Sequence, residues 1–377
     1  MKITGIRVQL CHFPLPAPFN PSWLAGFPQA TNGCAIYRIQ TDAGIEGVTA
    51  SPLIADEAKG MVNLLRATFV GRDPTQVEDV FKILRSATRS LGLRSWHLEP
   101  ACWDIIGKAA GLPVWRLLGG ARNRIRAYCS FGEVRDGKQR IDDVAHVKEL
   151  GFTAAKLRIR SMTIEEDVEQ VRLVREAHPE FTLMVDANMG WRVHGFAPYP
   201  EWDVSRAIRT ARALEEYRIE WLEEPLDQFD YRGYAEVRAH TSVPLAAGEM
   251  LSDLHGFRDL IEHRSVDIVQ PDATLTGGIL MARKVAGMAE AAGLRFNPHT
   301  WTNGIGLRIN MQLMGAAPNC DWCEFPYDPP GWVPEARDAM LTEPTSIDAE
   351  GFVTLPEGPG LGVELDEERI AAVGEEL

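Results

Sequence analysis

The strongest constraint on the fold of this chain is a series of short apolar runs that each end in charged or protonatable residues. The runs recur roughly every 25 to 35 residues between residues 156 and 324. Their polar residues are Lys156 and Arg158, Asp186 and Asn188, Glu223 and Glu224, Glu249, Asp272, His299 and Glu324. Because buried charges are costly unless they are paired or bind a metal, this pattern indicates one shared, metal-dependent active site.

Helix-like stretches separate the apolar runs, which is typical of strand–helix units and a parallel sheet. Helical periodicity is present in IEEDVEQVRLVREAHP, DVSRAIRTARALEEY and GILMARKVAGMAEAAG. With RIRAYCS (residues 124–130) as the first strand, eight strands end near Pro326. The sequence therefore predicts an α/β fold with a TIM-type (β/α)8 barrel, whose catalytic groups lie at the C-terminal ends of the strands.

The first 123 residues have a different pattern. ITGIRVQLCHF and CAIYRIQTDAG alternate like antiparallel strands, and helix-like stretches such as TQVEDVFKILRSATRS follow them. We therefore expect an α+β domain at residues 1–123 and the barrel at residues 124–335. The tail at residues 336–377 is too small for a core of its own, so we expect it to pack on the first domain.

Charge and hydropathy exclude two classes of partner. The net charge of −14 provides no basic face for phosphate backbones, so we expect no nucleic-acid partner. No apolar run approaches the ~20 residues that a membrane span requires, and MKITGIRV lacks the apolar stretch of a signal peptide. We expect a cytoplasmic protein that does not bind membranes.

Carboxylates at the ends of three consecutive runs predict a metal site. Asp186, one glutamate of the pair Glu223–Glu224, and Glu249 would be neighbours around the mouth of a barrel. Three such oxygen ligands suit Mg²⁺, and the absence of clustered His or Cys argues against zinc. Alternation along a strand does not decide which glutamate of the pair points inward.

These motifs, in this order, resemble the mandelate racemase subgroup of the enolase superfamily over nearly the whole chain. They are VDAN, WLEEP, GE, QPD followed by PHTW, and a final WCE; EPACWDIIGKAAGLPVWRLLGG and PGLGVELDEE resemble the capping domain of that subgroup. The resemblance implies a modified TIM (β/α)7-8 barrel with an α+β capping domain that the C-terminal tail completes. It also implies Glu223 as the metal ligand, one Mg²⁺ per site, a small-molecule carboxylate substrate and a homo-oligomer.

The chemistry expected at such a site is removal of a proton next to a carboxylate. That proton is very weakly acidic, because its loss places a second negative charge on the same group. Lys156 and an acidic Glu324 are the candidates that, with Mg²⁺, stabilise the resulting enediolate. His299 and Asp272 end adjacent runs, so Asp272 can fix the tautomer of His299 as the base. The alternative is that His299 is a hydrogen-bonded polar residue without a catalytic role.

Arg158 stands where many members of the resembled subgroup have a second basic lysine. A guanidinium holds its proton too firmly to be a good base at neutral pH, which argues against a two-base racemase. We expect Arg158 to bind a substrate oxygen, stabilise the enediolate or assist a departing hydroxide; a purely structural ion pair is the alternative.

With one competent base, the favoured reaction is dehydration of an acid sugar to a 2-keto-3-deoxy acid by a Mg²⁺-dependent carbon–oxygen lyase. Three alternatives stay open. They are a racemase or epimerase, a cycloisomerase acting on a lactone or anhydro sugar acid, and a non-catalytic sugar-acid binding relative.

Three further residues are candidates for substrate binding. Asn188 shares a strand face with Asp186, although it can instead be a turn cap. Trp23 lies in PFNPSWLAGFPQA, which resembles the closing loop of the subgroup's capping domain, and Trp301 follows His299 in PHTW.

The long insert at residues 188–202 is expected to line the pocket, and it carries Trp191, Arg192, His194 and Tyr199. We leave His194 out of the catalytic set.

Overall fold

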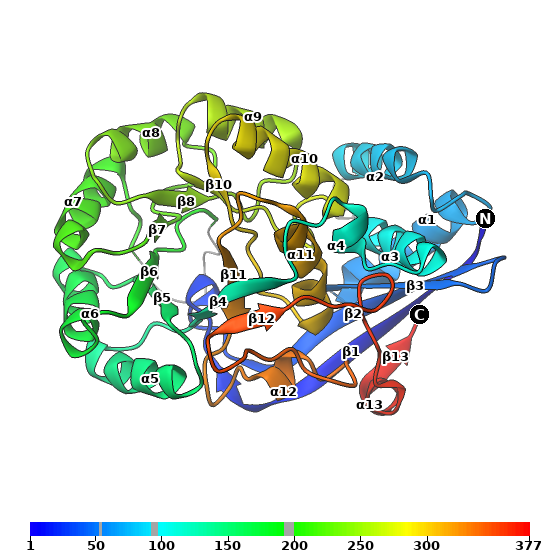
Figure 1. The fold of residues 1–377 in the computed structure, drawn as a ribbon, viewed down its shortest axis with the longest axis horizontal. Coiled ribbons are helices and arrows are strands. Elements are labelled where there is room, and N and C mark those ends of the chain that lie inside the picture. The colour runs from blue at the N-terminus through cyan, green and yellow to red at the C-terminus, as the bar shows by residue number, and fades with distance from the viewer. Residues whose placement is uncertain (53–54, 92–96, 192–199) are drawn as a thin grey trace.

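The chain forms a curled parallel sheet ringed by helices, beside a smaller antiparallel sheet that has helices of its own (Figure 1). The computed structural model describes residues 1–52, 55–91, 97–191 and 200–377. The predicted α/β class, a TIM-like barrel with a capping domain, is confirmed. Both chain ends lie on the capping-domain side (Figure 1).

The capping domain is built on long strands whose alternate residues face its helices. Its strands are β1 (Ile3–Phe19), β2 (Gln29–Thr41), β3 (Glu46–Pro52) and β13 (Gly374–Glu376), in the order β13-β1-β2-β3. Its helices are α1 (Ala55–Phe69), α2 (Val77–Leu91), α3 (Leu98–Ala110) and α4 (Val114–Leu117), and the single turn η1 (Ser22–Leu24) follows β1. Ile6, Val8 and Leu10 are buried against residues of these helices, since alternate strand residues share one face.

The parallel sheet has the eight strands that the periodicity predicted. They are β4 (Arg124–Ser130), β5 (Ala154–Arg158), β6 (Thr182–Asp186), β7 (Leu222–Glu223), β8 (Leu245–Ala247), β9 (Ile268–Val269), β10 (Arg295–Phe296) and β11 (Trp322–Pro326). Their order is β10-β9-β8-β7-β6-β5-β4-β11. Between β10 and β11, the side chain of Asn297 accepts hydrogen bonds from the backbone N–H groups of Asp321 and Trp322 at 2.9 and 3.3 Å, which joins the two ends of the sheet.

Helices cover the outside of this sheet (Figure 1). They are α5 (Gly137–Glu149), α6 (Ile164–Ala177), α7 (Val204–Leu214), α8 (Tyr231–Ala239), α9 (Leu254–Glu262), α10 (Gly278–Ala291) and α11 (Gly304–Ala316), with the turn η2 (Glu215–Tyr217) after α7. Local signals begin several of them. At α6, for example, Thr163 and Glu166 satisfy each other's backbone N–H groups in a capping box.

The interior of the barrel is filled by an apolar layer. Its members are Tyr128, Ala154, Met184, Trp221, Ala246, Ile268 and Trp322, which form a buried cluster of their own. Because strand residues two apart point to the same side, the next inward layer consists of Ser130, Lys156, Asp186, Glu223, Gln270 and Glu324. The polar site therefore lies directly next to this apolar layer.

The C-terminal segment contacts both regions. Its elements are α12 (Pro334–Arg337), β12 (Phe352–Thr354), α13 (Glu367–Val373) and β13. β12 pairs antiparallel with β4 of the parallel sheet, whereas β13 extends the capping-domain sheet beside β1. Domain limits at residues 123 and 335 stay a prediction.

A buried glutamate links the capping domain to the barrel. Glu99 of α3 accepts hydrogen bonds from the backbone N–H groups of Ile279 and Leu280, in the first turn of α10, at 2.7 and 2.8 Å. Gly278 has φ of +87°, and a Cβ there would lie 2.2 Å from Glu99 Oε2, so this close approach requires glycine. Glu99 therefore caps a barrel helix from the neighbouring domain.

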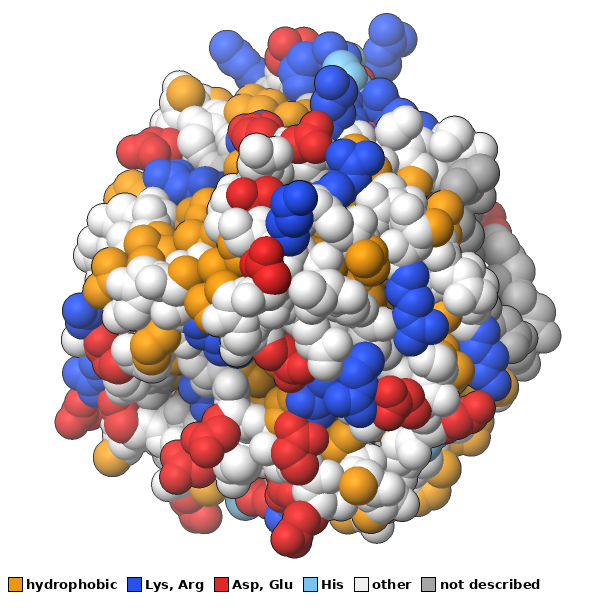
Figure 2. All heavy atoms as spheres, turned by 90° about the vertical axis from the view of Figure 1, so that its right-hand side faces the viewer, with side chains coloured by type: hydrophobic (Ala, Val, Ile, Leu, Met, Phe, Trp, Pro, Cys, Tyr) orange, Lys and Arg blue, Asp and Glu red, His pale blue; other side chains and the backbone are white. Residues whose placement is uncertain are grey.

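Surface charge is mixed on the face that carries the two termini, where acidic and basic side chains are interspersed (Figure 2). Within the described residues, none of the helices is both long and apolar enough to cross a membrane.

Candidate active site

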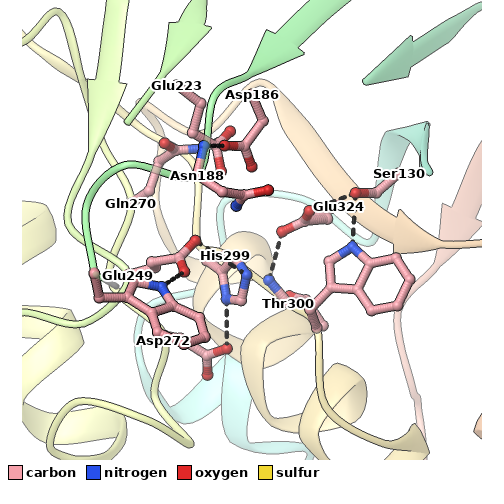
Figure 3. A network of polar contacts seen from close by, with 12 residues as sticks. Ser130, Asp186, Asn188, Glu223, Glu249, Gln270, Asp272, His299, Thr300 and Glu324 are labelled. Atoms are coloured by element: carbon pink, nitrogen blue, oxygen red, sulfur yellow. Dashed lines mark hydrogen bonds and ion pairs between the residues drawn. The ribbon is translucent and has the colours of Figure 1, made fainter. Parts of the chain in front are cut away.

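Three carboxylates at consecutive strand ends form a compact cluster. Asp186 ends β6 and is the ladder partner of Glu223 at the end of β7, while Glu249 follows β8. One oxygen from each of the three lies within 4.8 Å of the others, and all three side chains are buried. Figure 3 shows Asp186 and Glu223 side by side, with Glu249 on the other side of the central Asn188.

The electrostatics of this cluster fit a bound cation. Burial, together with the charges of Glu223 and Glu249, raises the pKa of Asp186 to about 7 against the opposing effect of Arg158 and Lys156. Oε2 of Glu249 accepts no hydrogen bond from the described residues, although it is buried. Three crowded, buried carboxylates suit a hard divalent cation, so these residues can hold Mg²⁺.

Glu224 is placed differently from Glu223. Its φ is +44°, and neither of its carboxyl oxygens has a hydrogen-bond donor among the described residues. Burial, followed by the charge of Glu249, raises the pKa of Glu224 well above its usual range. The structure brings Glu223, and not Glu224, into the cluster with Asp186 and Glu249.

Lys156 lies between the carboxylate cluster and Glu324. Its Nζ is 2.7 Å from Glu223 Oε1, 2.8 Å from Glu324 Oε1 and 3.5 Å from Asp186 Oδ2. Burial lowers the pKa of Lys156, but Glu223 and Glu324 outweigh it and raise that pKa above its usual value. Lys156 is therefore a fixed ammonium within the site.

Glu324 is held as a carboxylate in this arrangement. Its Oε1 also accepts a hydrogen bond from Ser130 Oγ at 2.7 Å, and its Oε2 accepts one from the backbone N–H of Thr300 at 2.6 Å (Figure 3). Burial raises the pKa of Glu324, but Lys156, His299 and Arg158 outweigh it and lower that pKa to about 2. Glu324 can therefore act as the predicted acid only if its pKa rises. That requires a weaker contact with Lys156 or an added negative charge nearby.

His299 and Asp272 form the predicted pair. Nδ1 of His299 is 2.9 Å from Asp272 Oδ2, and Nε2 is 3.3 Å from Glu249 Oε2. Burial lowers the pKa of His299, but Glu249, Glu324 and Asp272 outweigh it and raise that pKa to about 10. With Nδ1 bonded to Asp272, Nε2 is the nitrogen that faces the carboxylates of the site (Figure 3).

Arg158 is buried at the end of β5 and is surrounded by polar partners. Its guanidinium pairs with Asp186 and lies 3.3 Å from both Asn188 Oδ1 and Ser130 Oγ. Its Nε donates to the backbone carbonyl of Phe131 at 2.7 Å. Burial lowers the pKa of Arg158, but Asp186 and the other carboxylates outweigh it and raise that pKa, so the group stays cationic.

Asn188 connects the barrel to the capping-domain loop. Its φ is +49°, and its backbone N–H donates to Asp186 Oδ1 at 2.7 Å. This geometry is that of a local turn, which was the alternative to a substrate-binding role for Asn188. Its Oδ1 accepts a hydrogen bond from Ser22 Oγ of η1 at 2.5 Å. Figure 3 places the Asn188 side chain at the centre of the site, between Asp186, Glu324 and His299.

Aromatic side chains form a wall beside Arg158. The ring centres of Trp23 and Trp301 lie 5.4 and 5.8 Å from the guanidinium carbon, and Phe19 stacks on Trp301 at 5.4 Å. Phe19 is fully buried, whereas Phe27 of the same segment is 50% exposed. Trp23 and Trp301 also line a pocket of about 290 Å³ whose polar residues include His12, Gln29, Thr31 and Asn32.

Two residues of the site, Ser130 and Gln270, were not predicted from the sequence, whereas Trp191 of the insert was expected to line the pocket. Ser130 and Gln270 end the runs RIRAYCS and VDIVQ, so the rule that identified Lys156 and Asp186 also identifies them. Gln270 Nε2 donates to Glu223 Oε2 at 3.0 Å. Trp191 of the insert donates its indole N–H to Glu249 Oε1 at 2.6 Å. The other insert residues singled out, Arg192, His194 and Tyr199, lie outside the described residues.

Comparison with known families agrees with this architecture. Residues 139–369 match the family described as enolase C-terminal domain-like, and residues 8–119 match the mandelate racemase / muconate lactonizing enzyme N-terminal domain. The chain therefore belongs to the enolase superfamily, in its mandelate racemase subgroup.

Several relatives are named as enzymes of sugar acids or their lactones. The chain is 32% identical to D-galactarolactone cycloisomerase of Agrobacterium fabrum, over 98% of each chain. It is 30% identical to L-talarate/galactarate dehydratase of Salmonella typhimurium, over 86% of this chain and 81% of the relative. The crystal structure of L-talarate dehydratase from Polaromonas sp. JS666 with Mg and L-glucarate has a TM-score of 0.82, with 28% identity over 100% of this chain and 98% of that one.

Proposed function

We propose that this protein is a Mg²⁺-dependent dehydratase that converts an acid sugar to a 2-keto-3-deoxy sugar acid. The observation that carries the proposal is the geometry of the His299–Asp272 pair, in which Nδ1 of His299 lies 2.9 Å from Asp272 Oδ2 and Nε2 faces the carboxylates of the site. The dehydratases among the relatives support this reaction class.

The proton moves at a defined atom in the proposed mechanism. Nε2 of His299 takes the proton from C2 of the substrate, while Nδ1–H stays bonded to Asp272. The C–H electron pair becomes part of an enediolate, whose excess charge Lys156 stabilises. A substrate carboxylate beside Lys156 would compete with Glu324 for the ammonium and raise the pKa of Glu324, which would allow it to act as the predicted acid.

Elimination completes the reaction without a further reactant. The enediolate electrons form a C2=C3 bond as the C3–O bond breaks, and the proton on His299 Nε2 leaves with the hydroxide as water. The resulting enol tautomerises to the 2-keto acid. Mg²⁺ held by Asp186, Glu223 and Glu249 would supply positive charge that stabilises the enediolate and offsets the carboxylates that raise the pKa of His299.

Arg158 makes an epimerase less favourable than a dehydratase. Its strand, β5, is separated from β10, which precedes His299, by β4 and β11 in one direction and by four strands in the other. Arg158 therefore approaches the substrate from a different side, but a guanidinium does not exchange a proton readily at neutral pH. We propose that it binds a substrate oxygen instead.

A cycloisomerase is the second candidate. It would use the same proton abstraction, and two relatives, D-galactarolactone cycloisomerase and 3,6-anhydro-alpha-L-galactonate cycloisomerase, favour it. The two functions differ in mass balance, because dehydration removes water whereas cycloisomerisation leaves the mass unchanged.

Liquid chromatography coupled to mass spectrometry tests the proposal, because the chromatography separates isomers of equal mass. The protein with Mg²⁺ is incubated with galactarate, L-talarate, D-galactonate and arabinonate, and separately with D-galactarolactone and 3,6-anhydro-galactonate, beside a His299→Asn control. Loss of one water from an open-chain acid supports the dehydratase. Conversion of only a lactone or anhydro acid, at constant mass, would replace it by the cycloisomerase, and no conversion anywhere would reject both for these substrates.

A further inference from the structure

We infer that Asn310 of α11 is a positioning residue for the His299–Asp272 pair. The inference rests on the proposed function only in taking His299 as the base; the geometry that carries it involves residues outside the carboxylate cluster. Asn310 is fully buried and lies 38 residues beyond Asp272 in the sequence.

The two carboxyl oxygens of Asp272 have different partners. Oδ2 bonds to Nδ1 of His299 at 2.9 Å. Oδ1 accepts three hydrogen bonds, from the backbone N–H and hydroxyl of Thr274, both at 2.7 Å, and from Nδ2 of Asn310 at 2.9 Å. These donors occupy Oδ1 and leave Oδ2 directed at His299.

The amide of Asn310 has one favourable orientation. Its Oδ1 accepts a hydrogen bond from the backbone N–H of Ala273 at 3.0 Å, while its Nδ2 donates to Asp272. If the amide were flipped, the Asn310 oxygen would face the carboxylate of Asp272, and the Asn310 NH2 group would face the backbone N–H of Ala273. Both hydrogen bonds would be lost, so both support the same orientation. One side chain therefore fixes both the carboxylate of Asp272 and the backbone that follows it.

Asn310 and His299 belong to the same strand–helix unit. His299 lies between β10 and α11, and Asn310 lies within α11. This unit therefore contacts both carboxyl oxygens of Asp272, Oδ2 through His299 and Oδ1 through Asn310. Without Asn310, rotation about the Cβ–Cγ bond of Asp272 loses one of its restraints. The hydrogen bond from His299 Nδ1 to Asp272 would then have a less well defined direction. The orientation of the His299 ring, and so the position of Nε2, would be less well defined too.

Two variants remove the contact, and a third is a matched control. Asn310→Asp keeps the shape of the side chain but replaces the donor by an oxygen, and Asn310→Leu removes both hydrogen bonds without adding charge. The control is Gln312→Glu, the same amide-to-acid change on the same buried helix. The Gln312 amide contacts the backbone of Trp115 and Leu361, not Asp272. Melting curves establish which variants fold.

The first readout needs no substrate. In protein labelled with ¹⁵N-histidine and saturated with Mg²⁺, the Nδ1–H resonance of His299 is assigned by its loss in His299→Asn. We expect this resonance to shift upfield or disappear in the folded Asn310 variants and to stay in place in Gln312→Glu. An unchanged resonance in a folded Asn310 variant, or an equal change in the control, would overturn the inference.

The second readout is kinetic and uses an acid sugar that the wild type converts. In the Asn310 variants, kcat should fall about 10- to 100-fold with little change in KM, and the isotope effect of deuterium at C2 should rise, because proton abstraction becomes slower. Wild-type kcat and isotope effect in a folded Asn310 variant would contradict the inference. If the wild type converts no substrate, the proposed function fails, and the histidine spectrum still decides the role of Asn310.

Discussion

At the scale of residues, the basic groups of the site differ in whether they can accept a proton. Lys156 and Arg158 are each surrounded by carboxylates that raise their pKa, so both remain cations. The carboxylates raise the pKa of His299 as well, to about 10, and Mg²⁺ held by the triad would offset that rise. Nδ1 of His299 is fixed by Asp272, and Nε2 faces the site. The proposed reaction therefore depends on one imidazole.

Replacement of that imidazole should greatly slow proton abstraction without unfolding the protein. We expect His299→Asn to lower kcat by about 10²–10⁴-fold, the usual contribution of a general base. His240→Asn, at the exposed end of α8, is the control. The rate of C2 proton loss in D₂O measures the effect, and full activity in His299→Asn would exclude it as the base.

Replacement of Glu249 tests the metal ligands. Glu249→Gln removes a charge from the cluster and should weaken Mg²⁺ binding, which isothermal titration calorimetry measures directly. Glu262→Gln, on the exposed side of α9, should bind Mg²⁺ like the wild type. Equal affinity in Glu249→Gln and wild type would remove Glu249 from the ligand set.

The sequence predicted which residues meet at the site better than it predicted their orientation. Alternation could not distinguish Glu223 from Glu224, because β7 has two residues and Glu224 already has a positive φ, so the regular strand pattern has ended there. The contact of Asn188 with Ser22 also could not be predicted, since it joins residues 166 positions apart through a loop.

At the scale of elements, the sequence predicted the eight strands but not the contacts that hold them to the rest of the chain. The tail at residues 336–377 is expected to pack on the first domain, yet its strand β12 pairs with β4, whose partner residues lie more than 200 positions earlier. Such pairing depends on tertiary position and leaves no local pattern in the sequence. The same holds for Glu99, which reads as an ordinary helix-starting glutamate.

Glu99 gives the contact between α3 and α10 a pH dependence. Burial raises the pKa of Glu99 to about 7, against the three hydrogen bonds from Ile279, Leu280 and Trp103 that favour the charged form. A carboxyl whose folded pKa lies above its unfolded value of 4.5 stabilises the fold fully below pH 4.5. That contribution is lost as the pH rises from about 4.5 to about 7.

The Glu99→Gln variant isolates this contribution. The difference in unfolding free energy between wild type and Glu99→Gln should shift against the wild type by on the order of 1 to 3 kcal/mol between pH 4.5 and pH 7. Urea unfolding across this range measures it, with Glu262→Gln as the exposed control. A difference that does not change with pH would show that Glu99 has an ordinary pKa in the folded protein.

At the scale of the whole molecule, the polar site lies on the apolar layer of the barrel and against the capping-domain loop that carries Ser22 and Trp23. The site is therefore complete only when both domains are in place. A homo-oligomeric state, implied by the resemblance to the family, stays a prediction that light scattering can test.

Mg²⁺ should stabilise the entire fold. The pKa of Asp186 is raised by its burial and then by the charges of Glu223 and Glu249, and a cation offsets both effects only in the folded state. At a free Mg²⁺ concentration of 100 times the dissociation constant, the linkage relation gives about 2.7 kcal/mol of added stability. Melting curves with Mg²⁺ and with EDTA measure it, and identical curves would argue against a metal site at the triad.

The most direct test of the central claim is ¹H NMR of the wild type with Mg²⁺ in D₂O, following the C2 proton and the C3 position of galactarate, L-talarate, D-galactonate and arabinonate together. The proposed mechanism predicts loss of the C2 proton signal with formation of a 2-keto-3-deoxy acid, and neither change in His299→Asn. Deuterium at C2 with the C3 hydroxyl retained and the C2 configuration inverted would contradict it, because that outcome requires a second base.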